Sequence, residues 1–259
     1  MPPLPINRLK QALHANQRQV GLWLTLTSPT VTEIVAGAGF DWMLIDMEHT
    51  TNELPDVVHH LRAADSGGTA EPVVRVPWNE PVIVKRLLDS GARSLMFPYV
   101  QTAEEARRAV AATRYPPRGI RGYAGGSRAT GYGRMTGYAQ NAESSICVIV
   151  QIESPAAIDA IADIAAVDGV DGIFIGPNDL AANMGFLGQS SAPEVTAMVL
   201  KGLALIRAGG KAAGLLNYDE TSARKMFDAG FCFIAVGGDT GLVARGAERL
   251  ARAYQQPAI

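Results

Sequence analysis

The stretch from Cys147 to Leu180 reads CVIVQIESPAAIDAIADIAAVDGVDGIFIGPNDL. Its two apolar runs, Cys147–Ile152 and Gly172–Ile175, have the length and composition of buried β-strands. Between them, Ser154–Val167 has the small residues and spaced isoleucines of one amphipathic helix. A strand, a helix and a second strand in this order make the two strands parallel. The stretch therefore predicts a parallel sheet with helices packed on it.

Each strand of this unit leads into a carboxylate. Glu153 ends the first strand, and Asp179 follows the second behind a Gly-Pro turn. Because the strands are parallel, both carboxylates face the same edge of the sheet. Two carboxylates with no lysine or arginine beside them suit a hard divalent cation such as Mg²⁺ or Mn²⁺. Glu153 alone could instead cap the next helix, and Asp179 alone could be a turn residue, so the metal interpretation rests on the pair.

The same alternation of strand and helix continues along the whole chain. Several helix-like stretches end at a glycine, which is typical of a helix C-terminus. Eight strands and eight helices without a break in composition predict one (β/α)8 barrel over residues 1–259, with an open doubly wound sheet as the alternative. The expected strands are Val20–Leu26, Trp42–Ile45, Pro72–Val76, Ser94–Pro98, Cys147–Ile152, Gly172–Ile175, Ala212–Leu216 and Phe231–Val236. The expected helices are Thr30–Ala38, Glu53–Ala64, Pro81–Ser90, Thr102–Thr113, Ser154–Val167, Ala192–Ala208, Asp219–Ala229 and Leu242–Gln255.

One segment departs from this rhythm. Tyr115–Asn141 is long, rich in glycine and arginine, and lies between the fourth helix and the fifth strand. A connection of this length is usually functional or disordered. We expect an ordered, partly helical extended loop that starts at the bottom of the barrel and bends towards the mouth or a neighbouring subunit.

Composition narrows the class of protein. With 47% apolar residues and a net charge of −2, the chain can bury a large core and gives no reason to expect nucleic acid or an anionic membrane as a partner. The apolar runs are too short for a transmembrane helix, and the N-terminus lacks a signal-peptide pattern. The two cysteines, Cys147 and Cys232, lie in apolar runs and read as buried hydrophobic residues, which fits a reducing cytoplasm.

Polar residues gather where the expected strands end. Active sites of (β/α)8 barrels lie at the C-terminal ends of the strands, so these residues are the candidates for chemistry. A barrel core alone does not explain why strand after strand has an apolar body and a polar end. The residues in question are Asp46, Glu48 and His49 after strand two, Arg75 in strand three, Gln151 and Glu153 in strand five, Gly176–Asp179 after strand six, Leu216 and Asn217 at strand seven, and Asp239 after strand eight.

These residues carry a resemblance to a known family. The chain resembles the HpcH/HpaI aldolase family, the metal-dependent (class II) pyruvate aldolases that cleave or form 4-hydroxy-2-oxo acids. The likeness runs in order from about Gly21 to Leu250. It is carried by GFDW at 39–42, IDMEH at 45–49, Arg75, YPPRGIRG at 115–122, QIES at 151–154, DGIFIGPNDL at 171–180 and AVG at 235–237.

The resemblance implies roles for the metal and the donor substrate. Glu153 and Asp179 match the metal ligands, and the metal would be Mg²⁺, Mn²⁺ or Co²⁺. Arg75 matches the arginine that contacts the keto oxygen of the 2-oxo acid and stabilises an enolate. Gln151 and the backbone of Gly176, Pro177, Asn178 and Asp179 would help to hold the substrate. Leu216 matches an apolar residue near the methyl group of pyruvate.

The resemblance also implies the proton chemistry and the assembly. His49 matches the acid/base histidine and Asp89 the aspartate that orients it, with Asp46 and Glu48 as supporting residues. The base is either His49 or a hydroxide on the metal. The family likeness further implies a homo-oligomer, commonly a hexamer built as a trimer of dimers, in which the C-terminal helix packs on a neighbouring barrel.

The lysines favour the metal mechanism over an imine mechanism. Class I aldolases form a Schiff base through a lysine inside the barrel. Of the five lysines here, four lie in expected helices or in the N-terminal segment, and Lys211 precedes a strand at the bottom of the barrel. No lysine is therefore placed for imine chemistry.

Three alternatives stay open. One is a lyase for acyl-CoA esters, and a second is an oxaloacetate decarboxylase, both using the same enolate chemistry. The third is a non-catalytic barrel that binds a 2-oxo acid, against which the set of His49, Arg75, Glu153 and Asp179 argues. The aldehyde acceptor is undetermined, and Arg128 in the long loop is the candidate to contact it.

Overall fold

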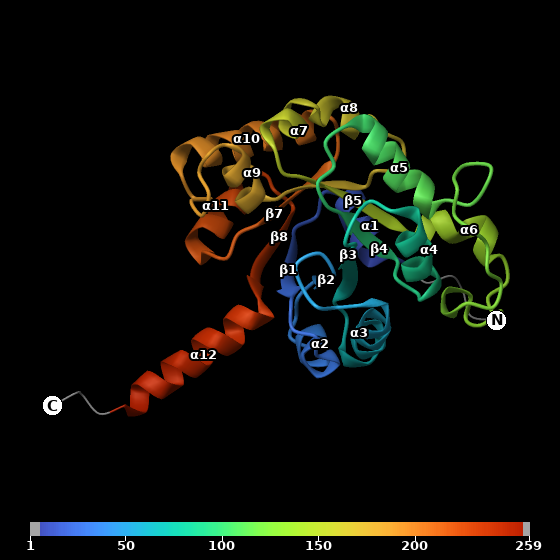
Figure 1. Ribbon diagram of the computed structural model, residues 1–259, viewed down its shortest axis with the longest axis horizontal. Helices are drawn as coiled ribbons and strands as arrows, with labels where there is room; N and C mark the ends of the chain where they lie inside the picture. The colour runs from blue at the N-terminus through green and yellow to red at the C-terminus, as the bar shows by residue number, and fades with distance from the viewer. Residues whose placement is uncertain (1–5, 256–259) are drawn as a thin grey trace.

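The computed structural model describes residues 6–255, in which eight parallel strands close into a barrel (Figure 1). Each strand pairs with the next one in the chain, and β8 pairs with β1. The predicted (β/α)8 barrel is confirmed, and the open sheet is wrong because no edge strand remains. The strands are β1 (Gln19–Leu24), β2 (Trp42–Asp46), β3 (Glu71–Arg75), β4 (Ser94–Phe97), β5 (Cys147–Ile152), β6 (Gly172–Ile175), β7 (Ala212–Leu216) and β8 (Phe233–Gly238).

The helices follow the prediction with four differences. The expected helix at 154–167 is interrupted at Ala160, whose φ of −84° and ψ of −1° separate two short helices. Short helices also form at Arg8–His14, at Tyr138–Ser145, which begins in the long segment expected to be partly helical, and at Pro177–Asn183, which was expected as a turn. The helices are α1 (Arg8–His14), α2 (Pro29–Ala36), α3 (Leu54–Gly67), α4 (Pro81–Asp89), α5 (Ala103–Thr113), α6 (Tyr138–Ser145), α7 (Pro155–Asp159), α8 (Ile161–Ala165), α9 (Pro177–Asn183), α10 (Pro193–Ala208), α11 (Glu220–Ala229) and α12 (Asp239–Tyr254), with a 3-10 turn η1 (Arg128–Thr130).

Large aromatic rings fill the inside of the barrel. Trp42, Phe174 and Phe233 are fully buried there and meet edge to face or tilted, with ring centroids 5.7–6.4 Å apart. Glycines leave the room that these rings need. A Cβ at Gly21 would lie 2.1 Å from the Trp42 ring, and one at Gly214 would lie 2.3 Å from Phe233. The interior is therefore a packed core rather than a pore, as in other barrels of this type.

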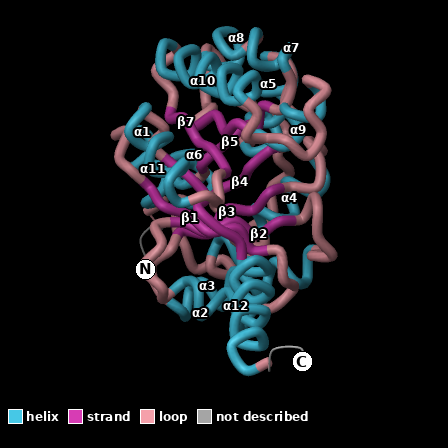
Figure 2. The backbone as a smooth tube through the Cα atoms, turned by 90° about the vertical axis from the view of Figure 1, so that its left-hand side faces the viewer, coloured by secondary structure: helices cyan, strands magenta, loops and turns pink. Residues whose placement is uncertain are grey.

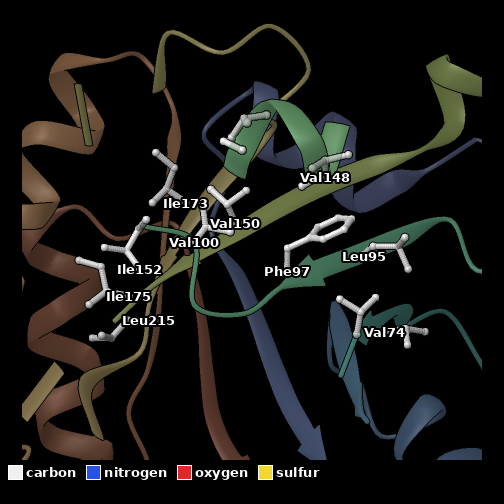
Figure 3. Packing of buried hydrophobic residues seen from close by; sticks show 14 of the residues in the cluster. Val74, Leu95, Phe97, Val100, Val148, Val150, Ile152, Ile173, Ile175 and Leu215 are labelled. Carbon is white, nitrogen blue, oxygen red and sulfur yellow. The ribbon is translucent and has the colours of Figure 1, made fainter. Parts of the chain in front are cut away.

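Alternation along the strands sets which residues face the helices and which face the interior. Val148, Val150 and Ile152 of β5 pack outward with residues of the neighbouring strands (Figure 3). Cys147 and Ile149 belong to the inner cluster, so Gln151 has the inward position next to the C-terminal edge. Trp23, Asp46, Arg75, Phe174 and Leu216 have the same inward parity on their own strands. This alternation directs one layer of side chains into the mouth of the barrel.

Helix α1 covers the opposite end. Leu9 and Leu13 of α1 belong to the inner cluster, and the Asn7 side chain donates to the carbonyls of Arg93 and Ser145. Both predicted buried cysteines are confirmed as buried, Cys147 inside β5 and Cys232 just before β8. With this end covered, the mouth at the C-terminal ends of the strands is the open end of the interior.

Helix α12 extends away from the barrel (Figures 1 and 2). Asp239 is the residue of this helix that is buried, whereas Leu242, Val243, Leu250 and Tyr254 are 58–83% exposed. In the described part of the chain no helix has the length and hydropathy needed to span a bilayer. Helix α12 is therefore an amphipathic helix with an apolar face that its own barrel does not cover.

Candidate active site

A cavity of about 220 Å³ opens at the C-terminal ends of the strands. It collects residues from six of the eight strands or the segments that follow them, as expected for a barrel of this type. Nine of the lining residues are predicted site residues: His49, Arg75, Gln151, Glu153, Gly176, Pro177, Asn178, Asp179 and Leu216. Four are additional: Trp23, Thr25, Phe174 and Tyr218.

Arg75 is held by a two-point ion pair with Asp46. The register of β2 and β3 places these two residues opposite each other, and the guanidinium donates from Nε and Nη2 over 2.9 and 2.6 Å. Asp46 also accepts hydrogen bonds from the Trp23 indole and the Glu48 amide. Burial acts to raise the pKa of Asp46, but the hydrogen bonds and charge of Arg75 outweigh it and lower this pKa. Asp46 is therefore a fixed anion that orients Arg75.

Arg75 also forms an ion pair with Glu48. Its Nη1 lies 2.9 Å from Oε2 of Glu48, and its guanidinium carbon lies 4.9 Å from the centre of the Trp23 ring. A guanidinium has five N–H donors and two of them donate to Asp46, so three are left for another ligand. These three donors belong to Nη1 and Nη2, the ends of the side chain away from the backbone. Arg75 can therefore hold a developing oxyanion without giving up its own anchors.

His49 lies on the loop after β2, with a side chain that is 65% exposed. Its nearest charged neighbour is Glu48, at 4.0 Å, and it makes no hydrogen bond within the described part of the chain. A histidine at the rim of a cavity with free ring nitrogens can exchange protons with a bound molecule. It still lacks the partner that would fix its tautomer.

The loop that carries Glu48 and His49 is tied to buried His60. Asn52 donates from Nδ2 to the carbonyl of Asp46 over 2.8 Å, so its Oδ1 faces Nε2 of His60 at 3.1 Å. This oxygen only accepts, so Nε2 of His60 carries the proton and Nδ1 accepts from the Thr32 hydroxyl at 2.6 Å. Burial lowers the pKa of His60, which keeps the ring neutral. His60 thus links α2 and α3 to the loop of the candidate site.

Changing His60 tests this link. His60→Leu leaves the Asn52 carbonyl without its donor, and we expect the free energy of unfolding to fall by about 1–3 kcal/mol. His60→Gln keeps an N–H donor near the Nε2 position, and we expect a smaller loss although glutamine is less apolar than leucine. Urea unfolding of both variants measures the difference. An equal or smaller loss in His60→Leu would show that His60 only fills space.

Glu153 is buried between two donors. Its Oε1 accepts from the Gln151 side chain over 2.6 Å and its Oε2 from the Tyr99 amide over 2.9 Å, and 2% of the residue is exposed. Tyr99 has a left-handed φ of 51°, unusual for a residue with a side chain, and its amide faces Glu153 in that conformation. These contacts fix the direction of the carboxylate.

Asp179 lies in the first turn of α9, not in a loop. Pro177 at the start of α9 and an acidic residue in its first turn are signals of a helix N-terminus. The Gly-Pro pair is also typical of a turn, which is how this sequence was interpreted. Asn183, one turn further on, donates to the carbonyls of both Glu153 and Asp179 over 3.0 and 2.9 Å. This amide therefore fixes the relative position of the two segments that bear the carboxylates.

The close approach of Gly176 to Glu153 requires a glycine. A Cβ at this position would lie 2.4 Å from Oε1 of Glu153 and 2.8 Å from Nε2 of Gln151. Any side chain would therefore push Glu153 out of its place. We infer that the backbone between β6 and α9 is shaped around this carboxylate.

The residues present fit a hard divalent cation. Burial, together with the charges of Glu48 and Asp179, raises the pKa of Glu153 to about 8. Carboxylates that crowd in this way are stabilised when a cation joins them, and their oxygens are the donors that Mg²⁺ and Mn²⁺ prefer. No group of three or more acidic, histidine or cysteine side chains is arranged for a metal within residues 6–255. Glu153 and Asp179 both line the cavity and carry carboxylate oxygens of this kind.

The raised pKa of Glu153 makes a prediction about stability. Between about pH 4.5, the pKa of an ordinary glutamate, and pH 8, the folded protein holds a proton that the unfolded chain has lost. The free energy of unfolding of the metal-free protein should therefore fall as pH rises through this range, by roughly 1 kcal/mol per pH unit from this group. We expect Glu153→Gln to remove this slope in urea unfolding measured from pH 5 to pH 8. A slope equal in both proteins would contradict the raised pKa.

Two predicted site residues lie at the other end of the barrel. Asp89 ends α4 and accepts from the buried Arg121 over 2.9 Å. Arg128 donates to the carbonyl of Ser90 over 3.1 Å and to Asp65 over 2.6 Å. The chain therefore does not bring Asp89 to its own His49, because α4 runs from the mouth to the bottom and ends at Asp89. It does not bring Arg128 to its own mouth either, because Arg128 begins η1 and is bound to Ser90, just past the end of α4, and to Asp65 in the last turn of α3.

Sequence reasoning missed several residues of the site. Tyr218 and Thr25 lie just past the ends of β7 and β1. They were not predicted as site residues because they lie outside the expected catalytic motifs. Asn183 gave no signal because α9 was not expected. Trp23 lies within β1, and its indole donates to Asp46 at the cavity. A search of every residue within two positions of a strand end would have found Tyr218 and Thr25.

Comparison with known proteins agrees with this geometry. A sequence model of the HpcH/HpaI aldolase/citrate lyase family matches residues 19–246. A 4-hydroxy-2-oxo-heptane-1,7-dioate aldolase of Salmonella dublin is 49% identical over 249 residues, which cover 96% of this chain and 94% of the relative.

Two solved structures have the same architecture. An HpcH/HpaI aldolase/citrate lyase family protein from Burkholderia cenocepacia J2315 is 42% identical with a TM-score of 0.93, over 96% of this chain and 100% of that one. An HpcH/HpaI aldolase from Desulfitobacterium hafniense DCB-2 is 30% identical with a TM-score of 0.86, over 96% of this chain and 98% of that one.

Proposed function

The chain belongs to the HpcH/HpaI aldolase/citrate lyase family, and from this premise we propose which reaction its site performs. It is a carbon–carbon lyase of the aldolase type. We propose that, with a divalent metal, it reversibly cleaves 4-hydroxy-2-oxo acids to pyruvate, or a related 2-oxo acid, and an aldehyde. The proposal rests on the observation that Glu153, Asp179 and Arg75 line the same cavity.

The metal ligands are proposed to be Glu153 and Asp179. A divalent cation at these carboxylates supplies a Lewis acid that polarises the carbonyl of the 2-oxo acid. Tyr99 and Gln151 hold the Glu153 carboxylate in one orientation. Asn183 keeps the Asp179 segment at a constant distance from it. These neighbours pre-organise the site, so ligand binding needs little rearrangement of the protein.

Arg75 is proposed to stabilise the charge that forms on the keto oxygen. In cleavage the proton leaves the C4 hydroxyl, the C3–C4 bond breaks, and its electron pair becomes the enolate of the 2-oxo acid. Uncommitted N–H groups on Nη1 and Nη2 of Arg75 donate to this oxygen. Because Asp46 and Glu48 already fix the guanidinium, it needs no reorientation when the charge develops.

His49 is proposed to exchange the proton with the C4 hydroxyl. Its exposure at the rim gives it access to that hydroxyl, and the Glu48 carboxylate lies 4.0 Å away. Gln151 and the backbone at the start of α9 are proposed to hold the carboxylate end of the substrate, and Leu216 to border the methyl group of pyruvate. All of these residues line the cavity.

We further propose that the site is completed by a neighbouring copy of the chain. His49 has no orienting partner in the described part of its own chain, and Asp89 lies too far away to provide one. The exposed apolar face of α12 gives a second copy a surface to cover. A homohexamer, built as a trimer of dimers in the cytoplasm, would join α12 to a neighbouring barrel and bring its Asp89 to His49. Light scattering of the purified protein measures this mass.

Release of pyruvate tests the proposed reaction. Metal-stripped protein is mixed with a 4-hydroxy-2-oxo acid, with and without Mg²⁺, Mn²⁺ or Co²⁺, and pyruvate is followed with a lactate dehydrogenase assay. We expect pyruvate only when a metal is present. Absence of pyruvate with every metal and with several 4-hydroxy-2-oxo acids would contradict the proposal.

A further inference from the structure

A second cavity, of about 560 Å³, adjoins the mouth of the barrel. It lies between the segment after α9 and the start of α11. Pro177, Asn178, Leu216 and Tyr218 line both this cavity and the smaller one that holds the metal ligands. The two spaces thus share one wall. A substrate whose reacting carbons lie beside Arg75 has the larger space open to the rest of its chain.

The larger cavity is lined by neutral groups that are free to form hydrogen bonds. Ser190, Ser191, Thr196, Tyr218 and the side-chain amide of Asn178 make no side-chain hydrogen bond to any described part of the chain. Hydroxyls and amides both donate and accept, which matches the hydroxyl groups of a ligand. An apolar ligand would leave these groups without partners when it excludes water, and that costs binding energy.

The charge of this cavity disfavours a second carboxylate. Among residues 6–255 of this chain, no arginine, lysine or histidine lines it. Its charged member is Asp219, whose carboxylate accepts from the Ser222 amide and caps α11. A ligand carboxylate here would meet one negative charge and no positive charge, which opposes binding.

Tyr218 joins the two cavities. Its hydroxyl occupies the space above Gly238, where a Cβ would lie only 3.1 Å from the tyrosine oxygen. Burial raises the pKa of Tyr218 to about 12, so the phenol keeps its proton and can donate at neutral pH. The absence of a side chain at residue 238 therefore lets a hydroxyl donor lie beside the reacting end of the substrate.

From these observations we infer that the aldehyde acceptor is a short, uncharged, polyhydroxylated aldehyde. Its hydroxyl groups bind in the 560 Å³ cavity, and Tyr218 is a specificity-determining residue that contacts them. The inference rests on the proposed aldolase function and adds the class of the acceptor. It distinguishes this chain from its Salmonella relative, whose name denotes a substrate with a carboxylate at each end.

Three aldehydes of similar length test the inference in the direction of synthesis. With pyruvate and metal as constant partners, kcat/KM is measured for glyceraldehyde, butanal and succinic semialdehyde. We expect the wild type to favour glyceraldehyde over each of the others by roughly 10-fold or more. Tyr218→Phe and Thr196→Val each remove one hydroxyl with little change of shape. Each should lower the ratio of kcat/KM for glyceraldehyde to that for butanal by roughly 3- to 10-fold.

A control variant and a separate exchange measurement distinguish failure of this inference from failure of the proposed aldolase function. Tyr132→Phe removes an exposed phenol from the long loop and should leave the ratio unchanged. Proton–deuterium exchange at the methyl group of pyruvate, measured on the wild type without any aldehyde, reports the proposed function alone. If exchange occurs but the wild type prefers succinic semialdehyde or butanal, only the inference is overturned. The same holds if exchange occurs and neither variant changes the ratio. Absence of exchange with every metal would overturn the proposed function, and the inference with it.

Discussion

Arg75→Lys should reduce the metal-dependent exchange of pyruvate methyl protons by roughly 100- to 1,000-fold. Lysine keeps the positive charge but lacks the planar fork that donates two hydrogen bonds to Asp46 and forms an ion pair with Glu48. An ammonium bound to Asp46 has no N–H in the place of the remaining guanidinium donors. Exchange is followed by proton NMR in deuterium oxide. We also expect a loss of about 1–3 kcal/mol in the free energy of unfolding, because buried acceptors lose their donors.

Arg93→Lys is the matched control. Arg93 pairs with the buried carboxylate of Glu71 over 2.8 Å at the opposite end of the barrel, so the same substitution breaks a comparable pair away from the mouth. We expect stability to fall in this variant while exchange stays within about twofold of the wild type. Similar exchange rates in Arg75→Lys and the wild type would show that Arg75 only stabilises the fold.

Glu153→Gln should abolish metal binding and exchange together. The substitution keeps the size of the side chain but removes one of two negative ligands, and the affinity for Mn²⁺ should fall on the order of 100-fold or more. The variant should nevertheless be more stable than the metal-free wild type at pH 8. A neutral amide avoids the burial and the charges of Glu48 and Asp179 that disfavour the carboxylate. Isothermal titration with Mn²⁺ and urea unfolding measure these opposite effects.

Glu194→Gln is the control for this variant. Glu194 is an exposed residue in the first turn of α10, so its substitution changes the net charge equally and leaves the mouth untouched. Metal affinity and exchange should match those of the wild type. Retention of wild-type Mn²⁺ affinity in Glu153→Gln would remove Glu153 from the ligand set.

The barrel could be predicted from the sequence because its signals are local and repeated. Every strand is a short apolar run, and the adjacent helices have regular apolar spacing, so eight repeats specify closure even without knowledge of contacts. Helix α9 escaped prediction because its seven residues follow a Gly-Pro pair that also suits a turn. The break at Ala160 escaped because its sequence differs little from the helical residues around it.

The candidate site could be predicted in part. Residues at strand ends, such as Arg75 and Glu153, face the mouth because the strands are parallel, and this follows from the order of elements. The hydrogen bonds that orient them come from residues far apart in the sequence, such as Tyr99 with Glu153, and no periodicity reports these. His60 illustrates the same limit, since its role depends on contacts with α2 and with the loop after β2.

Asp89 shows where resemblance to a family exceeds what one chain contains. Its position at the bottom of the barrel follows from the direction of α4, yet the resemblance assigned it to His49 at the mouth. The two statements agree only if a neighbouring copy supplies this residue. When a residue's role is assigned by family likeness, the end of the barrel at which that residue lies should therefore be checked as well.

The central claim is that Glu153, Asp179 and Arg75 form a metal-dependent site that makes the enolate of a 2-oxo acid. The most direct test is proton–deuterium exchange at the pyruvate methyl group, measured by NMR on protein stripped of metal and then resupplied. We predict exchange that appears only with a divalent metal and disappears in Glu153→Gln. No exchange with any of Mg²⁺, Mn²⁺ and Co²⁺, or equal exchange without metal, would contradict the claim.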